Sequence, residues 1–192
     1  MPSIGAHMVV GHLVGEKLNI ETDDFIRGNL LPDIIDSKDS HHKIKGSIYL
    51  IPDINYWLNN LDFTNDLYIG YLVHLLLDKH YLEDYLGNLY PNQNVFIDGL
   101  IYKDYDYINN KLVTDIGLDI NKLVKILSNF NCIFSKEKLQ YNIECLSQYT
   151  PGITRYIDYE SFITFLKEIS NVISKELYSY ANKHKELSLR IR

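Results

Sequence analysis

The sequence predicts an all-α protein, a single-domain multi-helix bundle over residues 1–192. Three segments favour this fold class because their apolar residues recur at helical spacing: Ile4 to Leu18, Asp66 to Leu86 and Asp158 to Lys185. With 192 residues, 46% of them hydrophobic, the chain can bury a sizeable core and is too apolar to be disordered.

The first helix is expected from Ile4 to Leu18, directly after Pro2-Ser3. A short second helix is expected from Phe25 to Leu31, because Pro32 disfavours α geometry in the residue before it. Asp33 is therefore expected in a turn just after a helix.

The next helical stretch, Ser47 to Leu61, is weakened at Pro52, and the strongest helix runs from Asp66 to Leu86. Gly87 is expected to close that helix as a C-terminal cap. Between Gly87 and Tyr102 the sequence has loop chemistry, and a loop of that length is often functional.

Four helices are expected in the remaining chain, the last of them capped by Asp158. They are Lys103 to Val113, Asn121 to Phe130, Ser135 to Gln148 and Asp158 to Lys185.

Composition argues against several classes of protein. The net charge of −6 and the scattered lysines argue against a stable nucleic-acid partner, since such binders concentrate Lys and Arg on one face. No run approaches the roughly 18 apolar residues of a membrane span, and no secretory signal is visible, so we expect a cytoplasmic protein.

Cys132 and Cys145 are expected to be buried thiols, with a disulfide as the alternative.

One helical turn separates His74 from Asp78 within an apolar run that starts at Tyr68. Residues four apart lie about 40° apart around a helix, so both side chains can reach one atom. Burying either polar group alone costs several kcal/mol unless a partner compensates. A divalent metal is one such partner, and a hydrogen-bonded core pair is the alternative.

Three further potential ligands lie upstream of this pair, namely His7, Asp33 and His41. His7 shares its helix face with Val10 and Val14, so it is expected to point inward. Taken singly, each has an ordinary alternative, a core histidine or a helix cap.

Helix geometry excludes other histidines from the cluster. His12 lies about 140° around the helix from His7 and is expected to face outward, and His80 lies about 160° from Asp78. His184 is expected to be solvated.

Imidazole nitrogens and carboxylate oxygens without a thiolate suit Zn²⁺, with Fe, Mn or Ni as alternatives, better than Ca²⁺ or Mg²⁺. Two His and two Asp nearly satisfy one tetrahedral zinc, and a further His suggests a second ion bridged by a shared carboxylate. Adjacent ions are a common arrangement for hydrolysing phosphate esters.

At these residues the sequence resembles the zinc-dependent phospholipase C family, whose all-helical fold is shared with the fungal single-strand nucleases. The matching motifs, in roughly the first 85 residues, are Met1-Pro-Ser-Ile-Gly-Ala-His7, Phe25-Ile-Arg-Gly-Asn-Leu-Leu-Pro-Asp33, Ser40-His41 and Gly70-Tyr-Leu-Val-His74-Leu-Leu-Leu-Asp78.

The resemblance implies a first metal site made of Asp33, His41, His74 and Asp78. It implies that Asp78 bridges to a second ion held by His7. Residues 1–86 then form the metal-ligand half, and residues 103–192 supply supporting helices.

The chain also departs from the family. It starts Met1-Pro2, whereas the phospholipases use a processed N-terminal Trp as a ligand, and it has no His between His80 and His184 for a third site. Asp84 stands where the first of the later ligands would fall. Asp104 and Asp106 are candidate oxygen ligands, with a solvated helix face as the main expectation.

The sequence thus predicts a metal-dependent hydrolase of phosphate esters, with a phosphodiester or phospholipid-like substrate, that uses metal-activated water and has Asp33 or Asp78 as candidate proton acceptor. A phosphate-containing small molecule or a lipid head group is the expected substrate. The alternative is a degenerate metal-binding helical module without catalytic activity. An HD-type phosphohydrolase is disfavoured because its adjacent His-Asp pair does not occur here. The substrate and the oligomeric state stay open.

Overall fold

The computed structural model describes residues 2–35, 37, 39–44, 51–87, 100–129 and 135–191, and these residues are mostly helical with no strand among them. The predicted all-α class is confirmed. The helices are α1 (Ile4–Leu18), α2 (Asp23–Gly28), α3 (Leu31–Ile34), α4 (Ile54–Asn60), α5 (Asp66–His80), the π-helix η1 (Tyr81–Leu86), α7 (Leu100–Asp115), α8 (Ile120–Ser128), α9 (Lys136–Ser147), α10 (Tyr159–Ala181) and α11 (Lys185–Arg190). None of the helices in these ranges is long and apolar enough to span a membrane.

Side-chain caps determine where several helices begin. Ser3, Thr22 and Asp158 each accept a hydrogen bond from the backbone N–H three residues on, at 3.2, 3.2 and 2.9 Å. Such a cap satisfies one of the N–H groups that a first helical turn leaves without a partner. The predicted starts of α1 and α10 are confirmed, and α1 ends as predicted at Leu18.

The predicted position of Asp33 in a turn is wrong. The second helix ends at Gly28, and Pro32 lies in the first turn of α3, which contains Asp33. Proline is compatible with this place because the first turn needs no N–H from it.

Four other predicted boundaries differ. Asp53 caps α4, so that helix starts after Pro52, which forms an isolated bridge with Lys43; residues 47–50 of the predicted stretch lie outside the described residues. Gly87 has right-handed helical geometry (φ −59°), so it is not a left-handed cap. The expected last helix is two helices, α10 and α11, and α7 begins earlier than expected, at Leu100.

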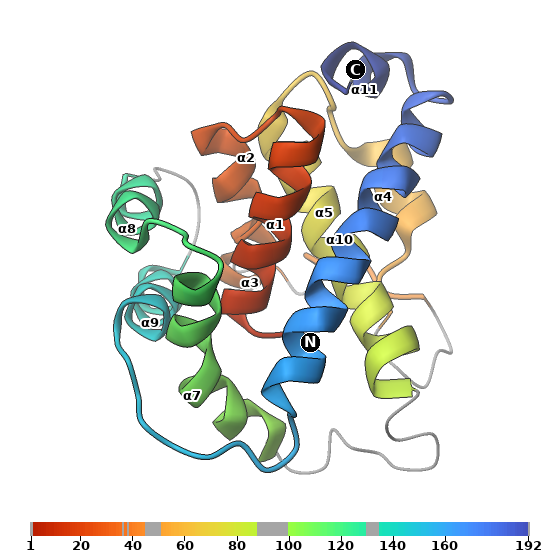
Figure 1. Cartoon of the computed structure of the whole chain (residues 1–192). Helices are drawn as coiled ribbons and strands as arrows, with labels where there is room; N and C mark the ends of the chain where they lie inside the picture. Colours follow the sequence, from red (N-terminus) through yellow and green to blue (C-terminus); the bar gives the residue numbers. More distant parts are fainter. Residues whose placement is uncertain are drawn as a thin grey trace.

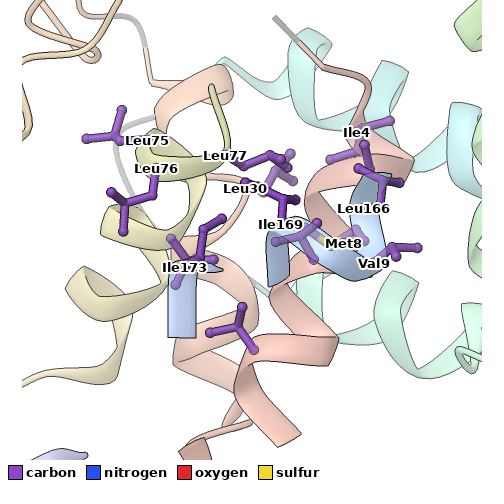
Figure 2. Close-up of a cluster of buried hydrophobic side chains, with 14 of the residues drawn as sticks. Ile4, Met8, Val9, Leu30, Leu75, Leu76, Leu77, Leu166, Ile169 and Ile173 are labelled. Atoms are coloured by element: carbon purple, nitrogen blue, oxygen red, sulfur yellow. The ribbon is translucent and has the colours of Figure 1, made fainter. Parts of the chain in front are cut away.

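The apolar core lies where α1 packs against both α5 and α10 (Figure 1). Figure 2 shows buried side chains of these three helices together with Leu30. They are Ile4, Met8 and Val9 of α1, Leu75, Leu76 and Leu77 of α5, and Leu166, Ile169 and Ile173 of α10. All belong to one hydrophobic cluster, so the inward faces of α1 and α5 are held rigidly side by side.

Two glycines allow α2 and α5 to approach each other at backbone distance. A Cβ atom on Gly28 would lie 1.9 Å from the Leu67 carbonyl oxygen, and one on Gly70 would lie 2.1 Å from the Phe25 carbonyl oxygen. Only glycine fits such a contact. This close approach brings the backbone at the end of α2 next to the middle of α5.

Candidate metal centre

The five predicted ligands come together from four parts of the chain. His7 lies on α1, Asp33 on α3, His41 on the segment 39–44, and His74 and Asp78 one turn apart on α5. Asp78 is central to the group. One of its oxygens lies 3.5 Å from His7 Nε2, and the other lies 3.3 Å from His41 Nε2 and 3.5 Å from His74 Nε2.

Asp33 completes the group on the side of His41 and His74. Its Oδ1 lies 3.6 Å from His41 Nε2 and 3.8 Å from His74 Nε2. Two subsets have ligand atoms that all lie within 4.8 Å of one another, His7 with His74 and Asp78, and Asp33 with His41 and His74. The rings of His7 and His74 stack in parallel, with centroids 3.7 Å apart.

These separations fit ligands around a cation better than they fit hydrogen bonds. A charge-assisted N–H···O bond measures about 2.7–2.9 Å. Two ligand atoms about 2.1 Å from a tetrahedral zinc lie about 3.4 Å apart. Distances of 3.3 to 3.8 Å around Asp78 and Asp33 therefore leave room for an ion between the side chains.

The same side chains carry buried polar atoms without hydrogen-bond partners. Seven such atoms occur in the described part of the chain, and six belong to this group: both nitrogens of His7, Nε2 of His41, Nε2 of His74 and both oxygens of Asp78. The seventh is Oδ1 of Asn29. Leaving one buried polar group unsatisfied costs about 1–3 kcal/mol, so a cluster of six favours a site that could hold a cation.

The orientation of His74 is determined by the backbone of α2. Its Nδ1 donates a hydrogen bond of 2.8 Å to the Asn29 carbonyl oxygen. A carbonyl only accepts, so Nδ1 carries a proton, and Nε2 is the nitrogen that faces the centre. The close packing of Gly28 and Gly70 brings this carbonyl within reach.

His41 is held in place by side chains of α4 and α5. Trp57 Nε1 donates to the His41 carbonyl oxygen at 3.1 Å, and the Tyr71 hydroxyl donates to the Ser40 carbonyl oxygen. The Ser40 hydroxyl lies 3.0 Å from His41 Nδ1. These contacts determine the path of the short segment and thereby the direction of the His41 ring.

The carboxylates of the centre are ionised. Burial opposes the charge on Asp78, but the surrounding imidazoles, His74 foremost, outweigh it and hold the pKa of Asp78 well below its usual range. His74 and His41 likewise lower the pKa of Asp33. Burial, helped by the neighbouring His74, lowers the pKa of His7 and keeps that ring neutral. Ionised carboxylates and neutral imidazoles are the forms that bind metal.

His41 differs from His7. Burial opposes its protonation, but the nearby carboxylates of Asp33 and Asp78 outweigh burial and raise its pKa to about 9. A cation bound at the centre would therefore displace a proton from His41.

The two other acidic candidates, Asp104 and Asp106, lie outside the metal centre. The expectation of a solvated face is wrong for Asp104, which is buried and accepts hydrogen bonds from the N–H groups of Arg155, Tyr156 and Ile157 at 2.7 to 3.1 Å. Asp106, two residues on, is exposed as expected. Asp104 has a structural role, because it ties the segment before α10 to α7.

The histidines excluded by helix geometry lie outside the centre. His12 is half-buried beside Glu21, at 2.6 Å, and His80 lies between Asp84 and Glu176. His184 is half-buried rather than solvated. The ring of His42 stacks on Tyr56.

Of the two cysteines, Cys145 is a half-buried free thiol, and Cys132 lies outside the described residues. Sequence reasoning missed Asn29, Trp57 and Tyr71. The signal for Asn29 was its place inside the Gly28-Asn29-Leu-Leu-Pro-Asp33 motif.

Comparison of the chain with protein-family models, curated proteins and solved structures finds no match. The interpretation of the centre therefore depends on its own geometry and on the motifs in the sequence.

Proposed function

We propose that this chain is a metal-dependent hydrolase of phosphate esters, with one or two Zn²⁺ ions held by His7, Asp33, His41, His74 and Asp78. The observation that carries the proposal is the convergence of five ligand side chains with six unpartnered buried atoms. Imidazole and carboxylate donors without a thiolate suit zinc, with Fe, Mn or Ni as alternatives. The resemblance of the ordered motifs to zinc-dependent phospholipase C supports the same chemistry.

Asp33, His41 and His74 would hold one ion with one oxygen of Asp78, and His7 would hold a second with the other oxygen. Bound ions of this kind lower the pKa of a coordinated water and neutralise charge on a phosphate.

Asp33 is better suited than Asp78 to accept the proton of the attacking water. The Asp33 side chain is 19% exposed, whereas that of Asp78 is 1% exposed and surrounded by imidazoles. A substrate can therefore approach Asp33 but not Asp78.

A second candidate function is a metal-binding helical module without catalytic activity. The enclosure of His7, His74 and Asp78 favours it, because structural ions have closed coordination shells.

Metal analysis and hydrolysis assays test both candidates. The purified protein is expected to contain near-stoichiometric Zn or Fe and to cleave p-nitrophenyl phosphate or bis(p-nitrophenyl) phosphate, and Asp78→Ala is expected to lose both properties. Asp84→Ala, which removes a carboxylate outside the centre, is the matched control and is expected to keep both. Bound metal without turnover would support the module, and an Asp78→Ala variant that keeps metal and activity would refute the site.

A further inference from the structure

A hollow of about 150 Å³ opens beside Asp33, between the start of α1 and helices α7 and α9. We call it the tyrosine hollow. The residues that characterise its wall are Asp33, Tyr102, Tyr105, Asp106, Tyr141 and Asn142.

The tyrosine hollow lies on an accessible side of the metal centre. The side chains of His7, His74 and Asp78 are at most 1% exposed, whereas that of Asp33 is 19% exposed and lines the hollow. If the phosphate of a substrate reaches the centre past Asp33, the alcohol group esterified to that phosphate lies in or next to the hollow.

The size of the hollow limits that group. The hollow has a volume of about 150 Å³. A cavity of this order accepts a benzene ring. The hollow therefore suits a single aromatic ring or a three-carbon polyol.

The chemistry of the wall favours an uncharged group. Tyrosines provide ring faces and hydroxyls, Asn142 provides an amide, and the described residues of the wall include no Lys or Arg. Asp33 would be offset by the bound ion, but Asp106 adds a negative charge that no ligand of the proposed centre balances, so the wall disfavours a second anionic group.

We propose that the tyrosine hollow binds the alcohol part of the substrate, and that the substrate is a single phosphate esterified to a small uncharged alcohol, aromatic or aliphatic. This inference rests on the proposed function. Water supplies the oxygen of the new P–O bond as the bond from phosphorus to the alcohol oxygen breaks. One proton of the water ends on the released alcohol, and the products are the alcohol and hydrogen phosphate. A substrate with a second phosphate in the hollow is disfavoured by charge.

Two substrates that differ only in a second phosphate test this selectivity. The zinc-loaded protein is expected to cleave 1,3-propanediol monophosphate with a kcat/KM about tenfold or more above that for the bisphosphate, since roughly 1.4 kcal/mol of repulsion gives a tenfold effect. Asp106→Lys is expected to shift the ratio towards the bisphosphate. Asp115→Lys, the same charge change on α7 outside the hollow, is the control and is expected to leave the ratio unchanged.

A binding measurement tests the hollow without turnover. By calorimetry, phenylphosphonate, whose C–P bond is not hydrolysed, is expected to bind more tightly than methylphosphonate. Asn142→Trp, which fills the hollow, is expected to abolish this difference, whereas Gln140→Trp on the exposed side of α9 is expected to retain it. Equal affinity for both phosphonates, or a difference that survives Asn142→Trp, would overturn the inference. Loss of all turnover with the phosphonate difference intact would count against the proposed function alone.

Discussion

His74 and His80 lie six residues apart on one helical run, and both are buried among carboxylates, yet their surroundings differ. Each nitrogen of His80 has a carboxylate oxygen at hydrogen-bond distance, Asp84 at 2.6 Å and Glu176 at 3.1 Å. His74 has the Asn29 carbonyl on one side, and on the other its Nε2 lies 3.5 Å or more from each carboxylate of the centre. The two sites have the same kinds of side chain. Their distances separate a satisfied ion-pair network from a cluster whose side chains are spaced as ligands around a cation would be.

Substitution of each histidine by glutamine provides the strongest test of this comparison. We expect His74→Gln to weaken metal binding by about a hundredfold or more, beyond the 10–100-fold typical for loss of an outer partner, because a direct ligand is removed. His80→Gln is expected to retain full metal content. Metal titration with a competing chelator, together with circular dichroism to verify folding, measures both effects.

Two other outcomes of these substitutions would contradict the assignment of the two histidines. If His80→Gln lost the metal and His74→Gln kept it, the assignment of the two clusters would be reversed. Equal retention in both folded variants would remove His74 from the centre.

The sequence predicts one part of this comparison better than the other. The pairing of His74 with Asp78 and the exclusion of His80 follow from angles around a single helix, which residue spacing determines. The contacts of His74 with Asn29 and of His80 with Glu176 span 45 and 96 positions. They depend on how helices dock, which local periodicity does not contain.

The same dependence on how helices dock explains the predictions that were wrong elsewhere in the chain. Asp104 follows the polar pattern of a surface helix, and only the chain at residues 155–157, folded over it, buries its carboxylate. Pro32 was expected to end a helix, although proline is equally compatible with the first turn of the next one. The ligand set came from motif order, whereas the hollow beside Asp33 required α7 and α9 to be in position.

A smaller effect is expected from the groups that hold His41. Trp57→Phe removes the donor to the His41 carbonyl, and Tyr71→Phe removes the donor to the Ser40 carbonyl. Each substitution is expected to weaken metal binding about tenfold, the lower end of the 10–100-fold range for loss of a group that holds a ligand in place. The reason is that the segment 39–44 then gains freedom to move the His41 ring.

Tyr159→Phe is the matched control, since it removes a tyrosine hydrogen bond to Asp115, on a different part of the molecule. Trp57 is also the chain's single tryptophan, so its fluorescence in the wild type is expected to change on metal addition. Unchanged affinity in both Trp57→Phe and Tyr71→Phe would show that His41 does not need these donors.

The smallest expected effect is the pH dependence of the His80 network. Burial opposes protonation of His80, but hydrogen bonds to Glu176 and Asp84 outweigh burial and raise its pKa above the usual value. A histidine with a raised folded pKa stabilises the fold fully below its unfolded pKa of about 6.5, and this contribution disappears as the pH rises through the folded value. Urea unfolding of wild type and His80→Gln, compared at each pH, isolates this contribution because the titration of the other groups cancels. We expect His80→Gln to cost about 1 kcal/mol near pH 6, a modest value because Asp84 is exposed, and less at alkaline pH. A difference that grew with rising pH would mean that His80 is neutral in the folded protein, and the contrast with the metal centre would then rest on distances alone.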